Sequence, residues 1–403
     1  MWNARQWTSH LSAASRLRAR RDRRDADAIA GGGRRVGGAS CAATLALPLE
    51  PQSRHRKRGQ WFEGWFVRLI DHTSGVTIAA IFGSLRLQRS SSGAAAISSL
   101  PFDEHILVLA WSADSGRQSM RSVQLAGDAV TLSGPGTADP TRPHVRWWST
   151  EHGGIEVRGD DAWLDLRLPK GLSLAANVSS PRAPWDRKRP DRAGPEGWLG
   201  ATGLLPCHYF VHTFRSPATY WLGGSSRSTG RGGRGVAHIE RNYGEAFPSG
   251  WVWAQACTEG GTLCLVLTGG LFVVGPLTTR TYILALRGQP ANSTATLDWT
   301  FRTTDADRVS EVREACQGRL LLNATSLDGR RRAALRITAP VGTFGDRLLV
   351  PTDGGFSDQP GCRESYDATV ALVAHGRAPG LDVEATFPRA ALEFGGTWQC
   401  GSC

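Results

Sequence analysis

The seventeen residues Thr262-Leu-Cys-Leu-Val-Leu-Thr-Gly-Gly-Leu-Phe-Val-Val-Gly-Pro-Leu-Thr278 contain no charged side chain and decide between two kinds of fold. A membrane-spanning helix needs about 20 unbroken apolar residues. This stretch is rich in β-branched residues and is interrupted by Gly269-Gly270 and by Gly275-Pro276. We therefore predict two buried β-strands around a tight turn at Gly269-Gly270.

The chain on either side of this stretch repeats the same pattern. Short apolar runs are separated by Gly, Pro, Asp or Ser about every ten residues, which is typical of antiparallel β-sandwiches and barrels. We expect an all-β fold of two consecutive antiparallel β-barrel or sandwich domains with few short helices, the clearest helix being Arg308–Cys316. The apolar runs include Gly75–Leu87, Ile106–Trp111, Trp163–Leu168, Trp251–Ala256 and Thr281–Leu286.

The length of 403 residues favours two or three domains. A segment from Ser179 to Gly197, with four Pro and mixed charges, is typical of a connection between two halves. We predict a basic tail at 1–58, an N-terminal β-barrel domain at 59–190 and a C-terminal β-barrel domain at 191–403.

The net charge of +11 is concentrated at the start of the chain. Residues 1–60 hold thirteen Lys plus Arg against four Asp plus Glu, so the remaining residues are close to neutral. A nucleic-acid groove needs basic side chains spread over a folded face, and we therefore expect no nucleic-acid partner. The Arg-rich tail, whose first acidic residue is Asp22, favours an organelle transit peptide, with a solvated arm as the alternative.

The cysteines do not form a metal-binding pattern in the sequence. Cys400-Gly-Ser-Cys403 is one CxxC near the chain end and lacks the βαβ context of a redox motif. Glycine-rich stretches occur without the strand–helix frame of a phosphate or dinucleotide site. We predict no metal and no cofactor.

The aromatic segment Trp61-Phe-Glu-Gly-Trp-Phe-Val-Arg-Leu69 contains the first candidate acid. In a β-strand, Trp61, Glu63 and Trp65 share one face. A carboxylate between two indoles must find a cationic partner or have its pKa raised until it stays protonated. A structural, Arg-paired Glu63 and a protonated, reactive Glu63 both stay open.

A second polar and aromatic cluster follows at His238–Gln255. His238, Glu240 and Asn242 share a face of one extended segment, and after a turn at Gly244–Gly250 the next segment presents Trp251, Trp253 and Gln255. Ionisable groups beside an aromatic wall indicate a pocket for a large apolar ligand with one polar end. The alternative is an aromatic core with a buried Glu–Arg pair.

A third segment, Pro206-Cys-His-Tyr-Phe-Val-His-Thr-Phe214, places His208 and Phe210 on one side of an extended chain. His208 and His212 could be two ligands of a metal, but no third ligand stands at a suitable spacing, which favours an ordinary polar and aromatic strand. His208 could instead relay a proton.

These segments resemble the tocopherol cyclase family in order and spacing over about residues 59–397. The resemblance is carried by Phe62-Glu-Gly-Trp-Phe66, by Leu205-Pro-Cys-His-Tyr209, by the block Ile239–Gln255, and by Ala391-Leu-Glu-Phe-Gly-Gly396. Arg241 stands where the family usually has Lys, Tyr243 where Trp is common, and Phe66 where Tyr is common. The resemblance implies two successive lipocalin-like β-barrels.

The resemblance also implies an activity, an isomerase reaction of vitamin E biosynthesis. An acid protonates the alkene of a phytyl (prenyl) benzoquinol, and the phenol oxygen closes the chromanol ring without a cofactor. We expect Glu240 or Glu63 to donate the proton and His208 or Asn242 to hold the quinol oxygen. The residues expected to contact substrate are Trp61, Trp65, Phe210, Tyr243, Trp251, Trp253 and Gln255.

The partner implied is a lipophilic prenylquinol, with contact to a membrane or lipid-droplet surface. The location implied is the plastid, at a membrane or plastoglobule, if the tail is a transit peptide, and the cytoplasm otherwise. Two other functions stay open: a hydratase that adds water to an isoprenoid double bond, and a carrier that binds lipophilic molecules without reaction.

Overall fold

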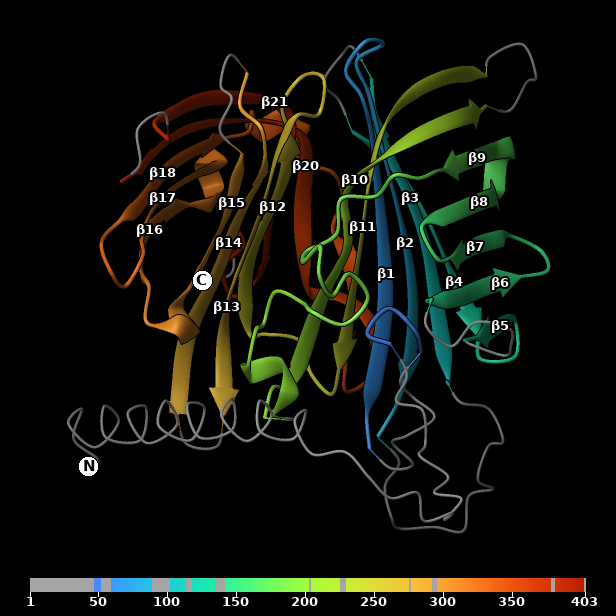
Figure 1. Ribbon diagram of the computed structural model, residues 1–403. Helices are drawn as coiled ribbons and strands as arrows, with labels where there is room; N and C mark the ends of the chain where they lie inside the picture. The colour runs from blue at the N-terminus through green and yellow to red at the C-terminus, as the bar shows by residue number, and fades with distance from the viewer. Residues whose placement is uncertain are drawn as a thin grey trace, which may run out of the picture. The chain divides into compact units, whose positions relative to one another are not determined.

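Antiparallel strands form nearly all the regular structure in the computed structural model (Figure 1). Within the described ranges the only helices are short 3₁₀ turns, so the all-β prediction is confirmed. The structure describes residues 47–51, 59–88, 102–113, 118–134, 142–202, 204–224, 230–274, 277–291, 296–377 and 381–401.

The first sheet has 11 strands in the order β4-β3-β2-β1-β11-β10-β9-β8-β7-β6-β5. It folds over on itself, since Phe82 on β2 and Trp147 on β6 lie in edge contact with ring centroids 5.4 Å apart. The strands are β1 (Trp61–Asp71), β2 (Val76–Arg86), β3 (Glu104–Ser112), β4 (Ser119–Ala126), β5 (Val130–Ser133), β6 (His144–Ser149), β7 (Gly153–Arg158), β8 (Asp161–Leu168), β9 (Leu172–Val178), β10 (Cys207–Gly223) and β11 (Arg231–Gly244).

The second sheet has 10 strands in the order β15-β14-β13-β12-β21-β20-β18-β17-β16, with β19 paired to β20. It also curls around its own core, because the Arg331 guanidinium on β18 lies 5.7 Å from the Phe301 ring centroid on β15. The strands are β12 (Gly250–Cys257), β13 (Leu263–Val274), β14 (Leu277–Gly288), β15 (Leu297–Arg302), β16 (Arg308–Glu314), β17 (Arg319–Thr325), β18 (Arg331–Thr338), β19 (Leu348–Thr352), β20 (Gly355–Gly376) and β21 (Val383–Gly396).

Strand β13 runs through Gly269-Gly270, so the tight turn predicted there is wrong. The strand pairs continuously with β12 on one side and β14 on the other. The glycines provide space: a Cβ on Gly269 would lie 2.3 Å from Cδ1 of Tyr282, the residue opposite it on β14. Glycine is needed at 269 because the Tyr282 ring packs against it. The local sequence alone cannot distinguish a glycine required by packing from a glycine required by a turn.

The helix predicted at Arg308–Cys316 is also wrong, because this segment forms strand β16. Its residues alternate between exposed and half-buried positions and pair with β17. The alternation has a period of two, which a strand buried on one face requires.

The boundary between the two sheets lies between Gly244 and Gly250, whereas the sequence suggested one near residue 190. Strands β10 and β11 belong to the first sheet because β11 pairs with β1 and β10 pairs with β9. The Pro-rich segment 179–197 therefore joins β9 to β10 within that sheet.

Residues 47–51, which the sequence placed in the basic tail, pack against the first sheet. Leu49 is buried in its core, and its carbonyl accepts a hydrogen bond of 2.9 Å from Trp65 Nε1. The rest of the predicted tail, residues 1–46 and 52–58, lies outside the described residues. Among the described residues, no helix has the length and apolar character needed to cross a bilayer.

Candidate active site

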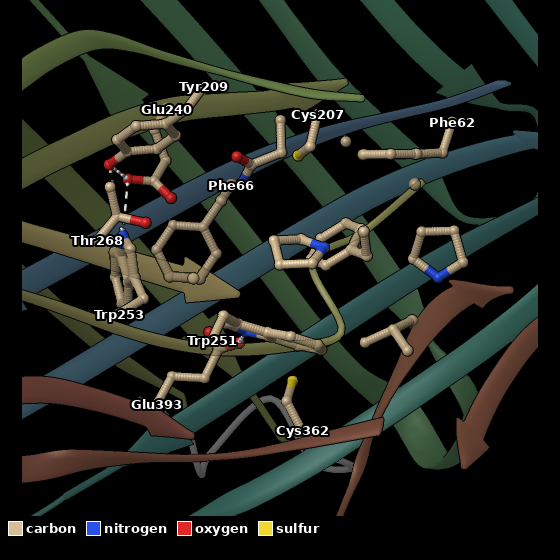
Figure 2. A pocket seen from close by; sticks show the side chains of 18 of the residues that line it. Phe62, Phe66, Cys207, Tyr209, Glu240, Trp251, Trp253, Thr268, Cys362 and Glu393 are labelled. Carbon is tan, nitrogen blue, oxygen red and sulfur yellow. Dashed lines mark hydrogen bonds between the residues drawn. The ribbon is translucent and has the colours of Figure 1, made fainter. Parts of the chain in front are cut away.

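A cavity lies between the two sheets (Figure 2). One side includes residues from β1, β2, β3, β10 and β11, and the other includes residues from β12, β13, β14 and β19 to β21. Its aromatic lining is Phe62, Trp65, Phe66, Tyr209, Phe247, Trp251, Trp253, Phe272 and Phe356. Five glutamate residues contribute atoms to its lining: Glu63, Glu196, Glu240, Glu364 and Glu393.

Strand alternation determines which candidates share the space between the sheets. On β1, Trp65 packs in the first sheet's own core, whereas Phe66 packs with Trp253 from the second sheet. The Phe66 and Trp253 rings meet edge to face with centroids 5.1 Å apart. The face assignments made from the sequence therefore hold, but they send the two predicted acids to different sides of the first sheet.

Glu240 faces the cavity and is held by three donors on one oxygen. Its Oε2 accepts from Tyr209 Oη at 2.5 Å, from His238 Nε2 at 2.8 Å and from Trp253 Nε1 at 3.2 Å. Burial, with Glu240 alongside, raises the pKa of Tyr209 well above its usual value, so the phenol remains a donor. Because Tyr209 and Trp253 both donate to it, this Glu240 oxygen acts as a hydrogen-bond acceptor.

Glu63 is the Arg-paired carboxylate of the two alternatives. Its Oε2 lies 3.2 Å from Arg241 Nη2, with neither side chain exposed, and its Oε1 accepts from Trp61 Nε1 at 2.9 Å. Arg241 also donates to the carbonyls of Pro48 and Glu50. The Glu63 carboxyl is therefore engaged by Arg241 and Trp61.

The other predicted site residues divide between the cavity wall and the structure around it. Asn242, Trp65, Trp251 and Trp253 line the cavity, whereas five predicted residues are not part of its described lining: Trp61, His208, Phe210, Tyr243 and Gln255.

His208 lies one residue away from the cavity. Its ring stacks on Tyr243 with centroids 5.0 Å apart, and its Nδ1 lies 3.0 Å from Oε2 of Glu196, which does line the cavity. His208 can therefore orient Glu196 but does not reach the cavity itself. Gln255, which also lies outside the described lining, accepts hydrogen bonds from Arg68. The Arg68 guanidinium donates to the Gln255 backbone carbonyl at 3.1 Å and to its side-chain oxygen.

Two cavity carboxyls, Glu364 and Glu393, were not among the predicted site residues. They stand opposite each other on β20 and β21. Glu393 carries a signal in the sequence, because it is the one charged residue in Ala390-Ala-Leu-Glu-Phe394. Glu364, between Arg363 and Ser365, carries none.

Among the described residues, no group of three or more His, Cys, Asp or Glu side chains is arranged to hold a metal ion. Four of the described cysteines form two disulfides, Cys257–Cys264 and Cys316–Cys400, which the sequence did not predict.

Comparison with known proteins supports the fold. No protein-family model matches the sequence, and no curated protein matches it. The structure of CghA aligns with a TM-score of 0.51 at 11% identity, over 85% of this chain and 89% of that one. CghA with Sch210972 aligns with a TM-score of 0.50 at 12% identity, over 83% and 88% of the two chains.

Kievitone hydratase from Nectria haematococca aligns with a TM-score of 0.45 at 10% identity, over 88% of this chain and 95% of that one.

The likeness to CghA extends over most of both chains, and the chain has a two-domain, lipocalin-like antiparallel β-fold.

Proposed function

We propose that the chain is an enzyme that protonates an isoprenoid alkene in the cavity between its sheets, and that it closes the chromanol ring of a phytyl (prenyl) benzoquinol as tocopherol cyclases do. One observation carries the proposal: a buried carboxylate, Glu240, faces a cavity walled by Phe66, Trp251 and Trp253. The resemblance of the segments around Phe62, Leu205 and Ile239 adds the choice of substrate.

The reaction balances without an oxidant or reductant. A proton adds to one alkene carbon, the π electrons form the new C–H bond, and a tertiary cation results. The phenol oxygen then forms the C–O bond and loses its proton to a base. An aromatic ring face stabilises such a cation by about 0.5–2 kcal/mol, and fixing oxygen and carbon together can contribute about 7–11 kcal/mol.

Glu240 fits the step in which the phenol is deprotonated. Its Oε2 is occupied by Tyr209, His238 and Trp253, and Figure 2 shows its second oxygen directed away from Tyr209 and Trp253. A carboxylate fixed in this way can stabilise the cation and receive the phenol proton. The substrate alkene would then lie among the aromatic rings.

The direct test is incubation of the purified protein with a phytyl-benzoquinol, followed by product identification by mass spectrometry. We expect a chromanol of unchanged mass, and a loss of about 10²–10⁴-fold in kcat for Glu240→Gln. Glu384→Gln, an exposed site on β21, is the matched control and should retain activity.

The two alternatives give different products in the same assay. A hydratase would return a product heavier by one water, with the ring open. A carrier would return the quinol unchanged after binding it. Either result would overturn the cyclase proposal.

A further inference from the structure

Glu364 and Glu393 form a carboxyl pair on the second sheet. They are directly opposite in the β20–β21 register, and Trp253 is opposite Glu393 on the other side, in β12. Both carboxyl residues line the same cavity as Glu240, and Glu364 is buried whereas Glu393 is half-buried. The pair therefore faces the space in which the proposed substrate would lie.

Each carboxyl of the pair is held in place by a neighbour. Trp251 Nε1 donates to Glu393 Oε1, and Tyr366 Oη donates to Glu364 Oε2 at 2.5 Å. Glu364 Oε1 is buried and has no hydrogen-bond partner among the described residues. Glu364 therefore has one oxygen that no described neighbouring side chain engages.

Burial and nearby charge disfavour two carboxylates at this pair. Arg68 is a cation close to the pair, with its guanidinium 5.6 Å from the Tyr366 ring centroid and bonded to carbonyls of Gln255 and Arg389. Glu240 faces the pair with a further negative charge. Burial together with Glu393 raises the pKa of Glu364 well above its usual value, and burial raises the pKa of Glu393 to about 7.

We propose that the pair Glu364 and Glu393 carries a proton at neutral pH and is the acid that protonates the isoprenoid alkene, while Glu240 is the base. This rests on the proposed function. Two carboxyl environments that favour opposite protonation states are how one site performs acid and base chemistry together. The assignment moves the proton donor from Glu240 to residues of the other sheet.

The proton balance closes over one turnover. The pair loses its proton to an alkene carbon, where the new C–H bond forms. After the phenol oxygen captures the cation, the phenol proton passes to Glu240. Glu240 releases that proton and the pair takes one up from solvent, so the enzyme returns to its starting state.

Two measurements test the pair. The first is infrared spectroscopy of the protein at pH 7, which detects the stretching band of a buried protonated carboxyl without any substrate. We expect the band in the wild type and in Glu240→Gln, and its loss in the Glu364→Gln/Glu393→Gln variant. A band that is lost in Glu240→Gln and kept in the double variant would overturn the assignment of the proton to the pair.

The second measurement is the pH profile of chromanol formation. Wild-type kcat should fall as pH rises through the titration of the pair, and Glu364→Gln/Glu393→Gln should lose about 10²–10⁴-fold at pH 7. Glu384→Gln is again the control, and circular dichroism confirms folding. Chromanol formation that is unaffected in the folded double variant would overturn only the donor assignment, whereas no chromanol from the wild type would overturn the proposed function.

Discussion

Trp253 Nε1 donates to Glu240 Oε2 at 3.2 Å, and this hydrogen bond joins β12 of the second sheet to β11 of the first. The Phe66 ring lies against the same indole. The orientation of Glu240 therefore depends on how the two sheets pack. Neither sheet alone would hold the carboxylate, the aromatic wall and the carboxyl pair together.

Replacing Arg241 by Met should lower the free energy of unfolding by about 3–5 kcal/mol, because it leaves the buried Glu63 carboxylate without its guanidinium. Denaturant unfolding measures this change. The double variant Arg241→Met/Glu63→Met should be more stable than Arg241→Met alone. A double variant that is less stable than the single one would show that the pair is not coupled.

Gly395→Ala should weaken ligand binding and chromanol formation. A Cβ at Gly395 would lie 2.0 Å from Cε2 of Trp251, which lies on the neighbouring strand β12. The Trp251 indole must therefore move away from β21 and lose its hydrogen bond to Glu393. We expect binding of the quinol, followed by quenching of tryptophan fluorescence, to weaken by about tenfold, which corresponds to about 1.4 kcal/mol. Gly342→Ala, where a Cβ meets no atom within 4 Å, is the control. Equal binding by both variants would contradict the role of Trp251.

The carboxyl pair should make the protein less stable as pH rises. In the folded protein the pKa of Glu393 is raised to about 7 from 4.5, so the folded state binds more protons than the unfolded state between these values. Stability contributed by the protonated group is complete below pH 4.5 and is lost as pH rises toward 7. Thermal unfolding from pH 4 to pH 8 measures the slope. Glu393→Gln should flatten it, and an unchanged slope would contradict the shift.

Removing the disulfide Cys316–Cys400 should destabilise the protein more than removing Cys257–Cys264. The first closes a loop with a sequence separation of 84 and the second one of 7. The chain-entropy estimate gives about 4.6 and about 2.4 kcal/mol respectively. Unfolding of the Cys316→Ala/Cys400→Ala and Cys257→Ala/Cys264→Ala variants compares them. The reverse order would show that local packing outweighs loop closure.

Strand alternation made much of the site predictable. A period of two is enough to place Glu63 with Trp65, and Glu240 with His238, because these residues are neighbours on one face of the same strand. The segment with Arg308 and Val312 is a strand and not the predicted helix, although its half-buried and exposed residues alternate. The predicted turn at Gly269-Gly270 is wrong because the Tyr282 ring that needs the space comes from another strand.

The sequence by itself determined the all-β class, the faces of the aromatic strands and the concentration of charge in the first 60 residues. These properties depend on residues near one another in the chain. Only the tertiary structure decided that Arg241 neutralises Glu63, that three donors meet on Glu240, and that Glu364 faces Glu393. The protonation state of a carboxyl depends on burial and on nearby charge, and both come from strands that are distant in sequence.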